Sequence, residues 1–305
     1  MPVLTSPLGA LPMRFRRQRV LIVGCGDVGL RAAAALPARV RVLALTSTPT
    51  RRGELRACGI TPLPGNLDQG ATLRRLAGLA THVLHLAPPP AQGKDDSRTR
   101  DLLCALRRRT PPAALVYGST SGVYGDCGGE WVAETRALQA GTARARRRVA
   151  AERQLRFYGR SAGVRTSILR IPGIYAPDRL GGTPRERLLK GTPVLRAEDD
   201  VYTNHIHADD LARACLAALW RGAPQRVYHA SDDSELKMGD YFDLAAGLYG
   251  LPRPPRLPRL QAAQELPPTL LSFMSESRRL ENTRLKRELR LRLRYPTVTA
   301  GLRAI

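Results

Sequence analysis

The chain has 305 residues, of which 43% are hydrophobic, and it is long enough to bury a large core in one or two interleaved domains. Its net charge is +23, but only four of the 49 basic residues are lysines, and the aromatic residues (5%) do not alternate with the basic runs. This pattern excludes an aromatic stacking platform for single-stranded nucleic acid, and we expect no specific nucleic-acid partner.

Other features of the composition indicate a protein of the cytoplasm. No apolar run reaches the roughly 18 residues of a membrane span, so no membrane partner is expected. Residues 1–18 lack the apolar core of a secretory signal and are predicted to form a disordered basic arm. The five cysteines are scattered and form no C-x-x-C pair, which is typical of a reducing compartment and argues against disulfides and a zinc site.

From residue 19 onward, short apolar strands alternate with helical segments. The pattern predicts strands at 19–23, 40–45, 81–87 and 113–117, separated by helices at 30–36, before Cys58, and near 68–79 and 96–109. Such alternation is typical of parallel β-α-β units, whose right-handed crossovers place helices on both faces of a sheet. We therefore predict an α/β fold with a doubly wound, mainly parallel sheet of the Rossmann type from Arg19 to about Tyr175, completed by strands at 203–230.

The first predicted strand ends in a glycine motif, GCGDVG, that opens the first helix. In such a loop Gly24 permits the tight turn, Gly26 lets the backbone approach a pyrophosphate, and Gly29 lets the helix pack closely on the strand. The helix N-terminus adds free N–H groups and a partial positive charge. The sequence predicts dinucleotide contacts from the whole loop, with Cys25 chiefly filling space: Gly24, Cys25, Gly26, Asp27, Val28 and Gly29.

The end of the second strand bears on the choice of cofactor. An acidic side chain there would bind the ribose 2′-hydroxyl of NAD, but this chain has Thr46, with Arg51 and Arg52 shortly after it. Guanidinium groups suit a 2′-phosphate, which favours NADP, with NAD as the other option. The alternative is that both arginines only solvate the next helix.

The strand at 113–117 runs into GSTSGVYG at 118–125. Together with the glycine loop, this segment resembles the S-[ST]-x-x-V-Y-G motif of the extended short-chain dehydrogenase/reductase superfamily, and in particular its NAD(P)-dependent epimerase/dehydratase-like members. The resemblance covers nearly the whole chain from Arg19 and includes IPGIYAP at 171–177 and NHIHADDL at 204–211. The loop departs from the family's G-x-x-G-x-x-G pattern, because Val23 stands at the first glycine.

The resemblance implies further cofactor contacts. An acidic residue of the family that reaches the adenine is replaced by Asn66, whose amide can still hydrogen-bond a base edge. The segment from Ile171 to Pro177 is similar to the one that lies beside the nicotinamide. The additional contacts implied are Asn66, Leu67, Ala87, Pro88, Pro172 and Ile174.

The arginine-rich stretch at 141–154 is the largest departure from the family. Members carry Tyr-x-x-x-Lys-x-x-x-Glu here, with the three side chains on one helix face. Anchoring this pattern on Glu152 places Arg148 at the lysine and Arg144 at the tyrosine. Because arginine stays protonated, Arg144 cannot be the general acid or base, and we expect it to act as a fixed charge. Arg148 can still hold the ribose and supply positive charge near the nicotinamide.

The resemblance aligns Thr120 with the family's hydroxyl residue, which hydrogen-bonds the reacting oxygen. Tyr124 is the nearest replacement phenol, with a packing role as its alternative. His205 and His207 form an H-x-H pattern that could suggest a metal. The family match explains this segment without one, and an aspartate there is expected to cap the following helix at 211–220. No metal site is predicted.

A smaller domain, formed by residues 176–202 and 231–305, is expected to cap the nucleotide. The sequence thus predicts an NAD(P)-binding oxidoreductase or epimerase/dehydratase-like enzyme that acts on a small hydroxyl- or carbonyl-bearing substrate, for example a nucleotide sugar. The alternative is a catalytically silent NADP-binding sensor or scaffold. We expect a monomer or a homodimer.

Overall fold

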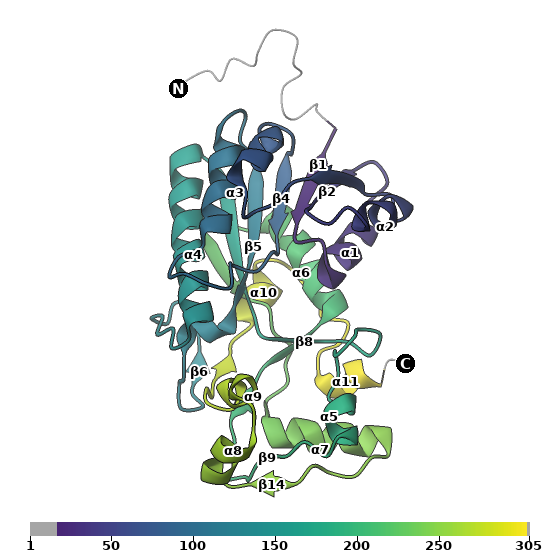
Figure 1. Ribbon diagram of the computed structural model, residues 1–305, viewed down its shortest axis with the longest axis vertical. Coiled ribbons are helices and arrows are strands. Elements are labelled where there is room, and N and C mark those ends of the chain that lie inside the picture. Colours follow the sequence, from purple (N-terminus) through teal and green to yellow (C-terminus); the bar gives the residue numbers. More distant parts are fainter. Residues whose placement is uncertain (1–16, 304–305) are drawn as a thin grey trace.

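The computed structural model describes residues 17–303, so the arm predicted for residues 1–18 lies almost entirely outside the described residues. The centre of the fold is a seven-stranded sheet in the order β12-β7-β5-β4-β1-β2-β3 (Figure 1), and every neighbouring pair is parallel. Its strands are β1 (Arg19–Val23), β2 (Arg41–Thr46), β3 (Thr61–Pro64), β4 (His82–His85), β5 (Ala114–Thr120), β7 (Arg165–Ile171) and β12 (Arg226–His229).

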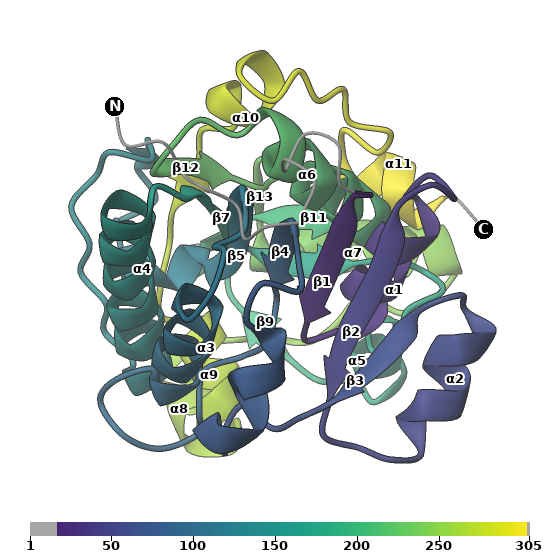
Figure 2. The ribbon, with the colours of Figure 1, turned by 90° about the horizontal axis from the view of Figure 1, so that it is seen from above.

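Helices cover both faces of this sheet, as Figure 2 shows. One apolar core joins the sheet to α1 (Asp27–Ala34), α2 (Arg51–Ala57) and α6 (Ala208–Arg221). The other joins it to α3 (Ser97–Arg107), α4 (Ala143–Ala162) and the 3-10 helix η2 (Gly70–Leu76). Burial on both faces explains the continuous apolar run of β1, in which Val20 to Val23 are all fully buried. The predicted doubly wound Rossmann-type fold is confirmed.

Three details differ from the prediction. The helix expected near 68–79 is η2, a short 3-10 helix, which is common in connections. Strand β5 continues beyond Tyr117 to Thr120, because its last residues still pair with β7. Of the region 203–230, only β12 joins the main sheet, whereas β11 (His205–His207) pairs with β8 (Gly173–Tyr175) in a separate parallel pair.

A second group of elements gathers below the carboxyl ends of the strands in Figure 1. Its core is built around α7 (Met238–Tyr249), from which Tyr241, Phe242, Ala245 and Ala246 are buried. None of the helices within residues 17–303 is long and apolar enough to cross a membrane. The remaining elements are η3 (Ser121–Tyr124), β6 (Trp131–Val132), α5 (Arg185–Leu189), β9 (Val194–Leu195), β10 (Tyr202–Thr203), β13 (Leu236–Lys237), β14 (Arg256–Leu257), α8 (Arg259–Glu265), α9 (Pro268–Phe273), β15 (Arg279–Leu280), α10 (Thr283–Arg287) and α11 (Val298–Leu302).

Candidate functional site

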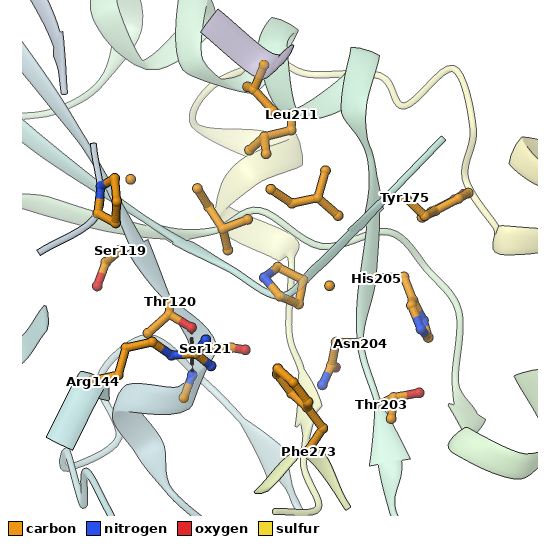
Figure 3. A pocket seen from close by; sticks show the side chains of 18 of the residues that line it. Ser119, Thr120, Ser121, Arg144, Tyr175, Thr203, Asn204, His205, Leu211 and Phe273 are labelled. Carbon is orange, nitrogen blue, oxygen red and sulfur yellow. Dashed lines mark hydrogen bonds between the residues drawn. The ribbon is translucent and has the colours of Figure 1, made fainter. Parts of the chain in front are cut away.

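A cavity of about 950 Å³ lies between the carboxyl ends of the central strands and the lower elements. Its walls come from the loop after β1, the ends of β4, β5 and β7, the start of α4, and the segments around β8, α5, β11, α7 and α9. In open parallel sheets, ligands bind outside the carboxyl ends of the strands. Figure 3 shows Thr120 and Arg144 on one side of this cavity and Tyr175, His205 and Thr203 on the other.

The glycine loop forms one end of the cavity. Gly24 has φ +84°, and a Cβ added there would lie 2.4 Å from the backbone nitrogen of Ala87, so only glycine fits. A Cβ on Gly26 would meet no atom within 4 Å, which leaves space above this backbone. A Cβ on Gly29 would lie 3.2 Å from Ile22, so this glycine sets the close packing of α1 on β1. The three positions have the geometry that a dinucleotide loop requires.

The residues between these glycines have different surroundings. Cys25 is 3% exposed, and burial raises the pKa of its thiol to about 11, which fits a packing role. Asp27 and Val28 line the cavity, and the Asp27 carboxylate accepts a hydrogen bond from Arg31 Nε at 3.0 Å. Arg179 lies 3.3 Å from the same carboxylate.

The predicted 2′-phosphate region lies beside this loop. Thr46 is buried at the end of β2, where its hydroxyl accepts a hydrogen bond from the backbone of Thr48. Arg51 Nη2 donates to the carbonyl of Cys25 at 2.9 Å, so this arginine is fixed next to the glycine loop. Arg52 is half-buried, and its Nε has no hydrogen-bond partner among the described residues. The structure therefore places two guanidinium groups at the start of α2 near this strand end, and the carboxylate of Glu54 in the same turn lies 3.6 Å from Arg51 Nε.

The other predicted cofactor contacts fall into two groups. Pro88, Pro172 and Ile174 line the cavity, whereas Ala87 lies beneath Gly24. Asn66 and Leu67 lie outside the cavity wall. The side-chain oxygen of Asn66 accepts a hydrogen bond from the Asp68 backbone at 3.0 Å, and Leu67 packs against one of the apolar cores. An adenine contact from Asn66 would have to come from its amide nitrogen.

Helix α4 brings its arginines to the cavity as its periodicity predicts. Thr142 caps the helix by accepting a hydrogen bond from the backbone of Ala145, and Arg144 and Arg148 then line the cavity on one face. Arg148 Nη1 donates to the carbonyl of Gly118 at 2.6 Å and to the hydroxyl of Tyr117 at 3.0 Å. The guanidinium of Arg144 lies 5.5 Å from the ring of Phe273 and has no hydrogen-bond partner among residues 17–303.

Thr120 and Tyr124, both predicted near the reacting atoms, differ in position. Thr120 lines the cavity, and its hydroxyl accepts a hydrogen bond from the backbone of Gly122 at 3.2 Å. Tyr124 is 1% exposed and does not line the cavity, and its hydroxyl contacts Arg170 and His229, each at 2.5 Å. Burial raises the pKa of Tyr124 to about 12. A proton-transfer role for Tyr124 does not fit this enclosed position, whereas the packing alternative does.

A buried ionic network connects the elements that carry the site residues. Glu152 and Arg170, each 2% exposed, form a two-point ion pair with contacts of 2.8 and 3.2 Å. The Ser119 hydroxyl donates to Glu152 at 2.7 Å. Removing one member of such a pair typically costs about 3–5 kcal/mol, so the pair fixes α4 against β5 and β7. Sequence reasoning used Glu152 only as an alignment anchor and missed Arg170, since an arginine in an apolar strand gives no signal of its partner.

The H-x-H segment has a structural role. His207, rather than an aspartate, caps α6, because its Nδ1 accepts a hydrogen bond from the backbone of Asp209 at 3.2 Å. Asp209 instead pairs with Arg31 at 2.6 Å, and Asp210 accepts backbone hydrogen bonds from Arg294 and Tyr295. Across residues 17–303, no group of three or more histidine, cysteine, aspartate or glutamate side chains has a metal-binding arrangement.

The far wall of the cavity contains residues that the sequence did not single out as cavity residues. Tyr175, Arg187 and Tyr241 line it together with His205, whose ring centroid lies 4.3 Å from that of Tyr241. Burial lowers the pKa of His205 to about 4, so its imidazole is neutral at physiological pH. Phe273 of α9 closes the wall next to Arg144. No motif marks Arg187, Tyr241 or Phe273, because they come from three elements, α5, α7 and α9, that are separated in the sequence.

Comparison with known proteins relates this geometry to a family. The profile of the NAD dependent epimerase/dehydratase family matches residues 20–230. A structure described as a functionally unknown conserved protein from Silicibacter pomeroyi is 31% identical, with a TM-score of 0.79 over 94% of this chain and 97% of that one.

Two enzymes of lower identity share the fold. A UDP-glucuronic acid 4-epimerase from Bacillus cereus in complex with NAD is 18% identical, with a TM-score of 0.73 over 94% of this chain and 97% of that one. A UDP-glucose 4-epimerase from Thermotoga maritima with UDP-glucose is 19% identical, with a TM-score of 0.77 over 93% and 96% of the two chains. No match to a curated protein was found.

Proposed function

Because the chain belongs to the NAD-dependent epimerase/dehydratase family, we propose that it is an enzyme that binds a nicotinamide dinucleotide in the described cavity and transfers hydride to or from a small hydroxyl- or carbonyl-bearing substrate. The observation that carries this proposal is the continuity of the cavity. One wall connects the open backbone at Gly26, where a pyrophosphate would lie, with Thr120 and Arg148, where the nicotinamide and substrate would meet.

The cofactor we propose is NADP, with NAD as the weaker ligand. Arg51 and Arg52 supply positive charge beside the loop, and neither Thr46 nor its neighbours in β2 supply the carboxylate that would select a ribose 2′-hydroxyl. When bound, the nicotinamide would accept or donate the hydride. Arg148 would hold the ribose, and Pro172 and Ile174 would bound the nicotinamide on the side of β8.

Two side chains, Thr120 and Arg144, would act on the reacting oxygen. The hydroxyl of Thr120 would hydrogen-bond the reacting oxygen, and the fixed charge of Arg144 would stabilise negative charge that develops on it. Arg144 cannot move a proton, so the proton must travel through water or a group on the far wall. Without a positioned acid, turnover about 10²–10⁴-fold below that of an enzyme with one is expected.

One observation favours a catalytically silent cofactor-binding protein instead. Tyr117, Tyr124 and Tyr158, which lie on β5, η3 and α4, are all buried and absent from the cavity wall. A sensor or scaffold needs the cofactor site but no proton donor. The two functions differ in whether hydride leaves the bound cofactor.

A substrate screen separates these functions. Purified protein is incubated with NADPH and with sugar nucleotides, aldehydes and ketones, and oxidation is followed by absorbance. We expect slow turnover that falls in Thr120→Ala and Arg144→Ala variants. Turnover that both variants retain in full would move the active site elsewhere, and tight NADPH binding without any turnover would support the sensor.

A further inference from the structure

The far wall of the cavity contains an arginine without an acidic partner. Arg187, on α5, lines the cavity, and its Nε and Nη2 atoms are buried with no hydrogen-bond partner among the described residues. Burial lowers the pKa of Arg187, and no acidic side chain among residues 17–303 forms an ion pair with it. Arg187 is half-buried, but leaving its two buried donors without an acceptor is costly, so their retention in a cavity wall calls for an acceptor.

The other charged groups of the cavity differ from Arg187. Both of its acidic residues are already paired, Asp27 with Arg31 and Glu276 with Arg278 at 2.8 Å. Arg147 donates to the carbonyl of Gly93 at 2.9 Å. Arg144 and Arg187 are therefore the two cavity guanidiniums without a hydrogen bond in residues 17–303, and they lie on different elements, α4 and α5.

The unpaired atoms of Arg187 form the edge with which this chain binds oxyanions elsewhere. Arg170 uses Nε and Nη2 to hold the two oxygens of Glu152, and Arg98 uses the same two atoms to hold Asp68 at 2.7 and 2.6 Å. This planar fork matches a carboxylate or a phosphate. At Arg187 the same fork has no protein carboxylate to bind.

Neighbouring aromatic residues complete a site for an anion. The Arg187 guanidinium lies 4.3 Å from the ring of Phe242, which holds it at the wall. Tyr241 also lines the cavity, its hydroxyl has no hydrogen-bond partner in the described part of the chain, and burial raises its pKa, so it stays a protonated donor. Asp232, the acid whose charge acts on Tyr241, is 4% exposed, does not line the cavity, and accepts a hydrogen bond from the Ser234 backbone.

We propose that Arg187 and Tyr241 form an oxyanion subsite that binds a carboxylate or phosphate group of the substrate. This group would lie at the end of the substrate opposite to the atoms that react near Thr120. The substrate class is then an anionic hydroxy or carbonyl compound, so this inference rests on the proposed function. Because Nε and Nη2 are shielded from solvent, the arginine must turn on its flexible stem to meet the oxyanion.

The subsite can be tested with simple anions on the protein saturated with NADPH, which fills the glycine loop. Inorganic phosphate and acetate are titrated at constant ionic strength, and the thermal unfolding midpoint reports binding. We expect wild-type protein to bind at least one of the two, and which one it binds identifies the group. Arg187→Gln should weaken that binding about tenfold or more, and Tyr241→Phe a few-fold.

The matched control is Arg185→Gln, which removes an exposed arginine two residues away on the same helix and outside the cavity wall. It should bind the anion as wild type does. Arg187→Lys keeps the charge without the fork, so it should fold if the glutamine variant does not and should still bind more weakly than wild type.

The outcomes separate the two proposals. NADPH binding is measured first, and its absence would count against the proposed function. With NADPH bound, no anion binding by wild type, or equal binding by wild type and both Arg187 variants, would overturn the subsite while leaving the proposed function intact.

Discussion

We propose that Arg144 takes the place of a family residue that exchanges a proton, although its own guanidinium stays protonated. Its guanidinium projects from the first turn of α4 into the cavity wall near Thr120 (Figure 3) and lies 5.5 Å from the ring of Phe273. Arg144 is exposed in this structure, so its electrostatic contribution requires bound cofactor and substrate to exclude water from this wall.

Replacing Arg144 with alanine should therefore lower kcat about 10²-fold while leaving cofactor affinity within a few-fold of wild type. Steady-state kinetics and a cofactor titration measure the two effects. Arg146→Ala is the matched control, because Arg146 is exposed on the same helix and does not line the cavity. Equal effects of the two substitutions would show that Arg144 acts only through the charge of the helix.

Cofactor choice is a second property decided by single residues. Replacing Arg51 and Arg52 together with alanine should weaken the binding of NADPH at least tenfold. The binding of NADH should weaken much less, because only NADPH carries the 2′-phosphate. Fluorescence titration of both reduced cofactors measures the ratio, and Arg56→Ala, an exposed arginine of the same helix, serves as control. An equal loss for both cofactors would remove these arginines from the phosphate site.

The sequence predicted best those site residues whose positions follow from local backbone geometry. Gly24, Gly26 and Gly29 could be assigned because their spacing follows from one tight turn, and Arg144 and Arg148 because helical periodicity sets their common face. Arg187 and Tyr241 could not be found, since their shared position depends on how α5 packs on α7. Tyr124 was misplaced because η3 turns its side chain toward His229 and away from the cavity.

At the scale of elements, the turn between β1 and α1 contains two glycines with different roles: Gly24 is needed for the fold, and Gly26 leaves space for the cofactor. A methyl group on Gly26 would meet no atom within 4 Å, and its backbone is extended, with φ −87° and ψ −154°. A methyl group on Gly24 would collide with Ala87 in a left-handed conformation.

Gly26→Ala should consequently change the free energy of unfolding by no more than about 0.5 kcal/mol, yet weaken the cofactor at least tenfold by occupying the space for the pyrophosphate. Gly24→Ala should instead destabilise the fold. Urea unfolding together with NADPH titration gives both quantities. Unaltered NADPH affinity in the Gly26 variant would place the pyrophosphate elsewhere.

The order of the main elements was also predictable, because buried parallel strands read as continuous apolar runs between amphipathic helices. The place of β11 outside the main sheet was not predictable, since it is a short segment whose pairing depends on a distant partner. β11 is held by β8, and β12 by β7.

At the scale of the whole molecule, burial makes stability depend on pH. The pKa values of His85 and His229 are lowered to about 3 and that of His205 to about 4, against 6.5 for an exposed histidine. At pH values between the lowered pKa and 6.5, these histidines bind protons in the unfolded chain but not in the folded one. Stability is therefore lost as pH falls below about 6.5. Asp232 opposes this partly, because burial raises its pKa to about 7 and protonation then favours the folded state.

The three largest histidine shifts set against Asp232 predict a loss of roughly 2–4 kcal/mol in the free energy of unfolding between pH 7 and pH 5. Burial also lowers the pKa of His82 and His207, which adds to this loss, and raises the pKa of Glu134 and Asp200, which opposes it. Urea unfolding at a series of pH values measures it. His85→Gln should flatten the dependence, because the substituted side chain no longer titrates. Stability that is constant or rises toward pH 5 would mean that the histidines are charged in the folded protein.

We propose, above all, that one dinucleotide binds along the cavity from the glycine loop to Thr120 and Arg148. Equilibrium titration of the wild-type protein with NADPH and with NADH, followed by nicotinamide fluorescence, tests it most directly. We expect saturable binding to a single site, tighter for NADPH than for NADH, and loss of both in Gly26→Ala. Failure of wild-type protein to bind either cofactor at millimolar concentration would contradict it.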